Sequence, residues 1–297
     1  MTPGSQFRQA LSSSLAQNTP LQLPGVINAY SAILARDTGF QALYLSGAGV
    51  ANASYGIPDL GITTLENVLE DVRRITSATH LPLLVDADTG WASSHSVAHS
   101  ISEIENAGAA GCHLEDQEEA KRCGHRPRKH LVSTTAMCDR LKAALDGRDN
   151  DDFVIMARTD AVAPEGLNAA LDRCHAYLET GADMIFCEAL ESLDDYRTFT
   201  KSLSAPVLAN ITEFGKTPLF TLQELASAGI AIALYPLSGF RAMNQAALNV
   251  FQQIRQHGTQ AHVLDQMQTR EELYQHLDYH RYEQEADQLL TENPPTS

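Results

Sequence analysis

The stretch LPLLVDAD, residues 81–88, joins a short continuous apolar run to two acidic residues that close it. A run of this length without alternation is typical of a strand that is buried on both faces of a parallel sheet. The same pattern, an apolar run closed by polar residues, occurs eight times along the chain. We expect strands at residues 24–27, 42–45, 81–85, 111–114, 153–157, 184–187, 206–209 and 230–234.

Segments with helical character lie between these runs. We expect helices at residues 30–39, 64–77, 94–108, 133–146, 166–180, 192–203, 219–228 and 238–257. A glycine, the residue preferred just past a helix end, precedes several of the next strands, at Gly39, Gly108, Gly181 and Gly229. The alternation predicts the α/β fold class, with a parallel sheet closed as a (β/α)8 barrel. An open doubly wound sheet shares the alternation, but no GxGxxG motif opens the first unit.

The length of 297 residues and the hydrophobic content of 43% suffice for one large barrel domain. We expect a single barrel domain over residues 1–297, with an N-terminal lead-in at 1–20 and a helical extension at 258–297. The pattern of apolar residues at 271–290 predicts a helix with a partly apolar face. Such a face needs a partner, either the protein's own barrel or a neighbouring subunit.

The formal net charge of −16 argues against nucleic acid or an anionic membrane as a partner. The five cysteines include no CxxC pair, so neither a disulfide framework nor a zinc site is indicated. A reducing cytoplasm is the simplest setting for such a chain. No apolar run approaches the length of a membrane span, and we expect no secretion signal.

The stretch KRCGHRPRKH, residues 121–130, concentrates five of the 21 Lys and Arg residues of this acidic chain. Nearby cations stabilise a thiolate, so we expect the pKa of Cys123 to lie below that of a free thiol. Gly124 permits a sharp turn or a close approach to a ligand. A solvated basic loop with an incidental cysteine is the alternative. We predict that residues 116–132 form a lid over the mouth of the barrel, because loops of this length are usually functional.

Asp86 and Asp88 are two residues apart, which places both side chains on one face of a strand. Active sites of barrels lie at the C-terminal ends of the strands. Two carboxylates at this position suit Mg²⁺, which takes one or two carboxylates and leaves room for substrate oxygens. Glu115 and Asp116 close another strand and strengthen this prediction. The alternative is a solvated pair of carboxylates that caps the next helix.

Other strand ends carry groups that suit a substrate with several carboxylates. Arg158 and Glu188 close buried strands, and they form either a structural ion pair or a grip on a substrate carboxylate. Further candidate donors to an anion are Ser46, Gly47, Ala48, Asn210, Ile211, Thr212, Arg241 and Arg270. These groups fit a metal-assisted carbon–carbon cleavage of a hydroxy polycarboxylate. Mg²⁺ would stabilise the oxygen charge, and Cys123, tuned by His125, would protonate the carbanion.

The hexapeptide KRCGHR, residues 121–126, resembles the signature of the isocitrate lyase superfamily. Other stretches resemble the 2-methylisocitrate lyase family, so that the similarity runs from about residue 5 to 290. These stretches are residues 44–47, 85–88, 113–117, 155–160, 210–214, 235–238, 240–244 and 267–270. The resemblance implies a (β/α)8 barrel that depends on Mg²⁺, with Mn²⁺ as an alternative. It also implies a homotetramer whose C-terminal helices are exchanged between subunits.

The activity implied by the resemblance is cleavage of (2S,3R)-2-methylisocitrate to pyruvate and succinate in the methylcitrate cycle of propionate breakdown. Asp86 and Asp88 match the residues that hold the metal, and Cys123 matches the general acid. Tyr44 is a candidate for handling the hydroxyl proton, and Arg158 and Glu188 match further catalytic positions. The resemblance assigns substrate contacts to Ser46, Gly47, Ala48, Cys123, Gly124, Arg158, Glu188, Asn210, Ile211, Thr212, Arg241 and Arg270.

The sequence departs from the family pattern at Ala48, Trp91 and Cys187, which changes the shape of the pocket but leaves the metal pair and the acid intact. Isocitrate lyase is the alternative enzyme, although that family usually carries long insertions. Phosphoenolpyruvate mutase and oxaloacetate hydrolase share the acidic metal residues but lack the cysteine hexapeptide. A non-catalytic barrel that senses tricarboxylates is a hypothesis of a different class, which the intact metal pair and acid disfavour.

Overall fold

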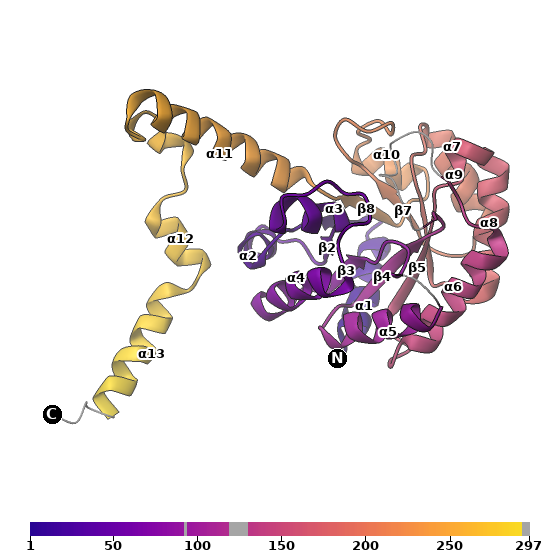
Figure 1. Ribbon diagram of the computed structural model, residues 1–297, viewed down its shortest axis with the longest axis horizontal. Coiled ribbons are helices and arrows are strands. Elements are labelled where there is room, and N and C mark those ends of the chain that lie inside the picture. Colours follow the sequence, from indigo (N-terminus) through magenta and orange to yellow (C-terminus); the bar gives the residue numbers. More distant parts are fainter. Residues whose placement is uncertain (92–93, 119–129, 293–297) are drawn as a thin grey trace. The chain divides into compact units, whose positions relative to one another are not determined.

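The computed structural model describes residues 1–91, 94–118 and 130–292, which form two compact units, Met1–Phe240 and Arg241–Ser297. The first unit holds an eight-stranded parallel sheet in the order β1-β8-β7-β6-β5-β4-β3-β2 (Figure 1). Its strands are β1 (Leu21–Pro24), β2 (Leu43–Leu45), β3 (Leu83–Asp86), β4 (Gly111–Glu115), β5 (Val154–Thr159), β6 (Met184–Cys187), β7 (Val207–Asn210) and β8 (Ile232–Tyr235).

The two ends of this sheet meet and close it. A parallel bridge joins Gly25, just after β1, to Tyr44 on β2, and the N–H of Val26 donates to the carbonyl of Tyr44 at 2.9 Å. Each strand therefore has a neighbour on both sides, and the predicted α/β barrel of eight parallel strands is confirmed.

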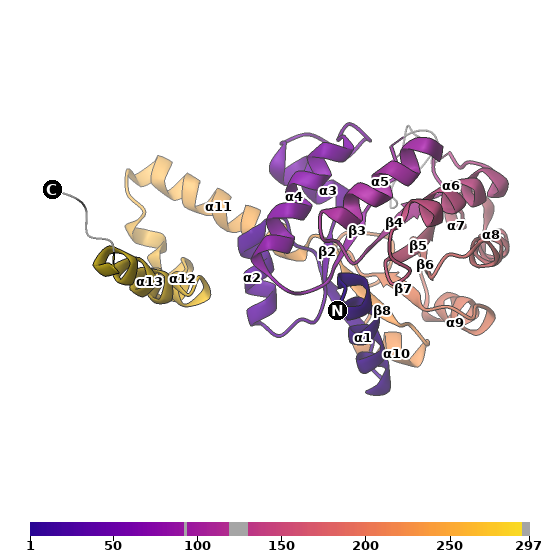
Figure 2. The ribbon, with the colours of Figure 1, turned by 90° about the horizontal axis from the view of Figure 1, so that it is seen from below.

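Helices follow the strands and surround the sheet on its outer side (Figure 1, Figure 2). They are α2 (Ala29–Asp37), α4 (Leu65–Ala78), α5 (Ser94–Asn106), α6 (Thr134–Gly147), α8 (Leu167–Thr180), α9 (Leu193–Ser202) and α10 (Leu222–Ser227). Short turns of helix, α3 (Gly47–Gly49), η1 (Val50–Ser54) and α7 (Val162–Glu165), occupy the connections after β2 and β5. The four glycines expected at helix ends all have positive φ, between 79° and 118°.

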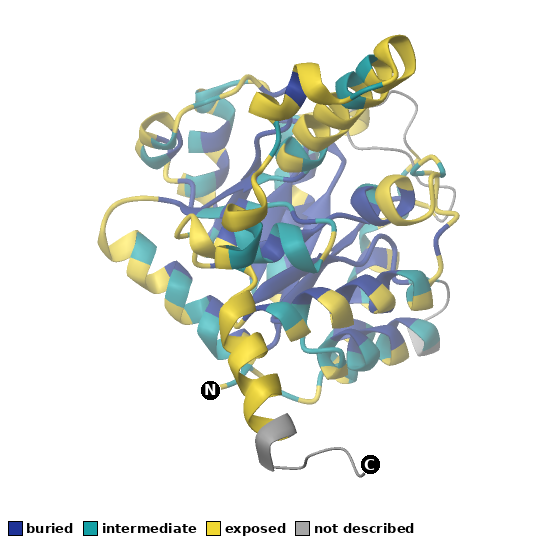
Figure 3. Cartoon of the chain, turned by 90° about the vertical axis from the view of Figure 1, so that its left-hand side faces the viewer, coloured by how far each residue is buried: buried dark blue, intermediate teal, exposed yellow. Residues whose placement is uncertain are grey.

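The core has two layers because side chains on a strand alternate between the inside and the outside of the barrel. Leu83 and Val85 belong to the outer layer, which packs against the helices, whereas Leu84 belongs to the inner layer. The N-terminal helix α1 (Pro3–Ala16) contributes Phe7 and Leu11 to the inner layer. Figure 3 shows the strands as the most buried part of the chain.

The first strand differs from its prediction. We expected it at residues 24–27, but β1 spans Leu21–Pro24 and pairs residue by residue with β8. Proline has no N–H to donate to a ladder, which restricts it to the end of a strand. A Cβ on Gly25 would lie 1.8 Å from the carbonyl oxygen of Pro236, so only glycine fits where the chain leaves the sheet.

The second unit is helical. It contains most of α11 (Ser238–His257), followed by η2 (Ala261–Gln266), α12 (Arg270–His276) and α13 (Tyr279–Glu292). The prediction of a single helix at residues 271–290 is wrong in one respect. The helix is interrupted at Asp278, whose φ is 52°, so that α12 and α13 are separate helices. No helix in the described part of the chain is long and apolar enough to cross a membrane.

Candidate active site

The alternation of side chains gathers polar groups on the inner face of the barrel, at the C-terminal ends of the strands. Leu84 and Phe186 belong to the inner layer, so Asp86 and Glu188, two residues further along, point the same way. On β4, Cys112 and Leu114 belong to the outer layer, so the alternate residues His113 and Glu115 face inward. We call the side chains that share this inner face the inner-face cluster. They are Tyr44, Asp86, His113, Glu115, Arg158, Glu188 and Asn210.

The two predicted metal carboxylates lie together against the turn after β2. The N–H of Gly47 donates to Asp86 Oδ2 at 3.0 Å. A Cβ built on Gly47 would lie 3.1 Å from Asp88 Oδ1 and 3.2 Å from Asp86 Oδ2. The backbone turns sharply between the two acids, because Asp88 has a φ of 48° and its N–H donates to Asp86 Oδ1 at 3.1 Å. Glycine at position 47 leaves the space that both carboxylates face.

These donors fit a hard cation. Asp86 and Asp88 are both buried and supply carboxylate oxygens within one small space. In the described residues no group of three or more His, Cys, Asp and Glu side chains is arranged to enclose a metal. A pair of carboxylates with an open side suits Mg²⁺, which retains water or substrate oxygens as its other ligands.

A buried tyrosine and histidine adjoin this pair. The hydroxyl of Tyr44 lies 2.8 Å from Nε2 of His113, which itself lies 3.5 Å from Asp86 Oδ1. Burial, and then the charge of Asp86, raises the pKa of Tyr44 well above its ordinary value, so the phenol keeps its proton. The histidine ring stacks on Tyr44 and meets Phe186 edge-on, at centroid distances of 5.8 and 5.2 Å.

Arg158 forms ion pairs with three carboxylates. Its Nε lies 3.0 Å from Asp160 Oδ2. Its terminal nitrogens lie 3.3 Å from Glu115 Oε2 and 3.4 Å from Glu188 Oε2. Burial alone lowers the pKa of Arg158, but Asp160, Glu115 and Glu188 raise it, and the net pKa lies well above the ordinary value. The structural ion pair between Arg158 and Glu188, considered from the sequence, is therefore present.

The turn after β7 completes this side of the site. The amide nitrogen of Asn210 donates to both oxygens of Glu188 at 3.3 Å. Thr212 is buried, with 7% of its surface exposed. Ile211 is different, because its side chain joins the outer core and its N–H donates to the carbonyl of Leu234 at 2.8 Å. The described structure therefore does not turn the side chain or the N–H of Ile211 toward the cluster, and its predicted substrate contact stays a prediction.

Several predicted site residues lie outside the described part of the barrel unit. Cys123, Gly124 and His125 lie outside the described residues, as does most of the predicted lid. Arg241 and Arg270 belong to the second unit, where both are exposed and Arg270 begins α12. Their predicted contacts with substrate stay predictions. By contrast, Ser46, Gly47 and Ala48 lie at the turn between β2 and η1, beside the carboxylate pair.

The sequence reasoning missed two side chains that the structure places in the cluster. His113 was given no role in the site, although it lies two residues before Glu115 and so shares its face. Asp160 was likewise given no role in the site, yet it makes the shortest of the three ion pairs of Arg158. The signal that would have found both is spacing: each is a polar residue two positions along the chain from a candidate, His113 from Glu115 and Asp160 from Arg158.

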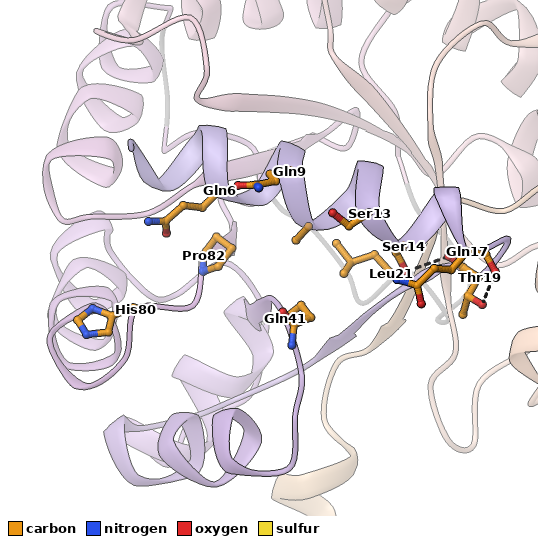
Figure 4. Close-up of a pocket in the computed structure, with 11 residues that line it drawn as sticks. Gln6, Gln9, Ser13, Ser14, Gln17, Thr19, Leu21, Gln41, His80 and Pro82 are labelled. Atoms are coloured by element: carbon orange, nitrogen blue, oxygen red, sulfur yellow. Dashed lines mark hydrogen bonds between the residues drawn. The ribbon is translucent and has the colours of Figure 1, made fainter.

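A cavity of about 670 Å³ lies at the other end of the barrel. Figure 4 shows α1 along one side of it, with Gln41, His80 and Pro82 across from the helix. Leu21, Gln41 and Pro82 stand at or just before the starts of β1, β2 and β3. No predicted site residue lines this cavity, and the N-terminal end of a barrel is the end associated with stability rather than chemistry.

Comparison with known proteins agrees with this geometry. A family model for phosphoenolpyruvate phosphomutase matches residues 11–255. The chain is 58% identical over 290 residues to a 2-methylisocitrate lyase of Shewanella oneidensis, with 98% of each chain covered. The fold is similar to that of 2,3-dimethylmalate lyase, with a TM-score of 0.89, 29% identity and coverage of 100% of this chain and 99% of the other. It is also similar to phosphonopyruvate hydrolase in complex with oxalate and Mg²⁺, with a TM-score of 0.84, 27% identity and full coverage of both chains.

The barrel, the carboxylate pair and the buried arginine at the strand ends thus define an enzyme of the phosphoenolpyruvate mutase and isocitrate lyase superfamily. Within that superfamily, the chain belongs to the 2-methylisocitrate lyase family.

Proposed function

We propose that this protein cleaves (2S,3R)-2-methylisocitrate to pyruvate and succinate, as a step of the methylcitrate cycle of propionate breakdown. The observation that carries the proposal is the 58% identity to a 2-methylisocitrate lyase over 98% of both chains. The inner-face cluster supports it, because it offers carboxylates for a metal and a cationic group for a substrate carboxylate.

We propose Asp86 and Asp88 as the residues that hold Mg²⁺. The support is the space that both carboxylates share beside Gly47, together with the Mg²⁺ in the related phosphonopyruvate hydrolase complex. When bound, the cation supplies Lewis-acid stabilisation of the negative charge that develops on substrate oxygen.

The first proton transfer falls to Tyr44 and His113. The bond to be broken joins the hydroxyl-bearing carbon to its carboxylate-bearing neighbour, and cleavage requires the hydroxyl to lose its proton. Tyr44 keeps its own proton in the resting enzyme, so it accepts the substrate proton only if it passes its own to Nε2 of His113, 2.8 Å away. Asp86, 3.5 Å from that nitrogen, stabilises the resulting imidazolium.

The cleaved bond leaves its electron pair on the carbon that becomes part of succinate, where it delocalises into the adjacent carboxylate. Arg158 and Asn210, which flank Glu188, are the described groups that suit a carboxylate dianion at this place. Cys123 is proposed to give its thiol proton to this carbanion, which completes succinate, while the other fragment leaves as pyruvate. Exclusion of water by residues 116–132 is part of the same proposal.

Substrate choice depends on one methyl group, because methylisocitrate and isocitrate differ only there. Leu237 is half-buried after β8, and a Cβ on Gly49 would lie 3.5 Å from its Cδ2 and 3.5 Å from Cβ of Ser46. Leu237 therefore borders the turn beside the carboxylate pair, and Pro236 is buried next to it. We propose that these two residues make room for the methyl group.

We expect kcat/KM for methylisocitrate to exceed that for isocitrate by roughly 10–200-fold, the range for one methyl in a fitted pocket. Leu237→Phe should reduce this ratio, because the larger ring fills the space for the methyl. Kinetics on both substrates with wild type and variant measure the effect, and Leu219→Phe, at an exposed position, is the control. A wild type that prefers isocitrate would overturn the assignment, whereas an unchanged ratio in Leu237→Phe would remove only the account of the methyl pocket.

We propose that the protein is a cytoplasmic homotetramer in which the C-terminal helices are exchanged between subunits. The second unit exposes large apolar side chains, including Leu248, Phe251, Tyr282 and Leu289, which need a partner to bury against.

We propose that residues 1–297 form one barrel domain, with the lead-in at 1–20 and the extension at 258–297. Free thiols at Cys112, Cys138, Cys174 and Cys187 suit a reducing compartment.

Truncation after Gln260 should give a smaller oligomer, because it removes the apolar side chains of α12 and α13. It should also reduce activity, since Arg270 is lost with them. Light scattering measures the mass, and a full-length Glu283→Gln variant, altered at an exposed position, serves as the control. An unchanged mass after truncation would contradict the exchange of helices.

A further inference from the structure

Asp116 follows Glu115 at the end of β4, and its carboxylate points away from the inner-face cluster. The residue is fully buried, with 0% of its surface exposed. Three donors reach the carboxylate: the hydroxyl of Thr159 at 2.7 Å, the N–H of Asp160 at 2.9 Å and the hydroxyl of Tyr177 at 2.8 Å. A buried carboxylate is costly unless it is hydrogen-bonded, and this one has been surrounded by donors from β5 and α8.

One side of this carboxylate is anchored to the outer helices. Arg173 lies 3.6 Å from Asp116 Oδ2, and it is held in turn by both oxygens of Glu165 at 2.7 and 2.8 Å. The same guanidinium donates to the carbonyl of Val132 at 3.0 Å, and the N–H of Val132 donates to the carbonyl of Asp116 at 2.9 Å. Asp116 is thus fixed on the side of α8.

The other side of the carboxylate leads to Arg158. Asp116 Oδ1 accepts the N–H of Asp160, whose own carboxylate accepts Arg158 Nε at 3.0 Å and a terminal nitrogen at 3.3 Å. In addition, the N–H of Asp116 donates to the carbonyl of Arg158 at 3.2 Å. Asp116 therefore holds Arg158 at its backbone and, through Asp160, at its guanidinium.

We propose that Asp116 is a positioning residue for the reaction: it orients the Arg158 guanidinium toward the substrate carboxylate by fixing the backbone and carboxylate of Asp160. The inference rests on the proposed function, in which Arg158 binds that carboxylate. An apolar residue would fill the same volume at lower desolvation cost. The carboxylate is instead the group that ties Asp160 to the anchored network around Arg173.

A double-mutant cycle tests whether Asp116 acts through Arg158. Asp116→Asn keeps the shape but replaces one acceptor oxygen by a donor, and it should lower kcat/KM for methylisocitrate by about tenfold to a hundredfold. In an Arg158→Lys background the same substitution should change kcat/KM by less than about threefold, since the group that it positions is already gone. Equal factors in the two backgrounds would overturn the proposal.

Asp183 provides a matched control for a purely structural carboxylate. It lies just before β6 and accepts Arg8 at 2.8 Å, Arg148 at 3.0 Å and the N–H of Ile155 at 2.9 Å. Asp183→Asn should lower the melting temperature as Asp116→Asn does, but should leave kcat/KM within about twofold of wild type in either background. A fall in kcat/KM for Asp183→Asn as large as that for Asp116→Asn would show a general effect of stability and overturn the proposal.

A second variant and a crystal structure test the proposal if Asp116→Asn does not fold or if the proposed function fails. If Asp116→Asn does not fold, Tyr177→Phe removes a single donor from the same carboxylate, and its smaller loss of kcat/KM should also vanish in the Arg158→Lys background. A crystal structure of the folded variant reports on positioning without any substrate. An Arg158 guanidinium displaced from Asp160 supports the inference even if the proposed function fails, and an unmoved one overturns it even if the wild type cleaves methylisocitrate.

Discussion

Cys123→Ser is expected to lower kcat for methylisocitrate by about 10²–10⁴-fold while KM changes little, because removal of a positioned general acid costs this much. A serine hydroxyl has nearly the same size as the thiol but is a much weaker acid, so the variant should still bind substrate and fail to protonate the carbanion. Steady-state kinetics with Mg²⁺ present, together with the melting temperature, measure the effect.

Cys138→Ser is the matched control for this variant, since Cys138 is a free, half-buried thiol on α6. It should retain wild-type kcat. A Cys123→Ser enzyme that keeps more than about a third of wild-type kcat would show that another group is the acid.

Removal of the metal should have an equally large effect. EDTA should abolish turnover and Mg²⁺ should restore it, because Asp86 and Asp88 are proposed to hold a cation that the reaction requires. The Asp86→Ala, Asp88→Ala double variant should remain inactive at any Mg²⁺ concentration. Calorimetric titration with Mg²⁺ provides a readout independent of activity, and the heat of binding seen for wild type should be absent in the variant.

An Asp151→Asn variant, altered at a fully exposed carboxylate near the start of β5, controls for the loss of negative charge. It should bind Mg²⁺ and turn over as the wild type does. Full activity in the double variant at Asp86 and Asp88 would remove the metal role from these residues.

The sequence predicted the barrel well because its signal is local and repeated. Apart from the first, each apolar run closed by a polar residue corresponds to a strand, and that residue lies at or next to the strand's C-terminal end, as with Asp86 on β3 and Asn210 on β7. The first strand was placed three residues too late, since its position is set by pairing with β8 and by the close contact of Gly25 with Pro236. That contact joins residues more than 200 positions apart, beyond the reach of any local pattern.

Contacts between residues far apart in the sequence also limited the prediction of the site. The alternation of faces predicted that Asp86, Arg158 and Glu188 meet at one end of the barrel. It did not predict that Arg158 pairs with Asp160, Glu115 and Glu188 at once, because the distances between these side chains are set by how the neighbouring strands pack. The anchoring of Asp160 by Asp116 is likewise a tertiary contact across 44 residues, which no spacing in the sequence indicates.

The break in the predicted C-terminal helix has a similar origin. Residues 271–290 have helical character throughout, yet Asp278 adopts a φ of 52° and separates α12 from α13. The rings of Tyr274 and Tyr279 stack across this break with a centroid distance of 4.1 Å. A stacked pair of aromatic rings stabilises the chain where the helix is interrupted, and helix propensity alone gives no indication of this contact.

Product analysis by mass spectrometry tests the central claim most directly. The full-length enzyme with Mg²⁺ is incubated in parallel with (2S,3R)-2-methylisocitrate and with isocitrate, and the products are followed over time. We expect rapid formation of pyruvate and succinate in equal amounts from methylisocitrate, and slow formation of glyoxylate and succinate from isocitrate. Faster cleavage of isocitrate, or no cleavage of methylisocitrate by a folded enzyme supplied with Mg²⁺, would contradict it.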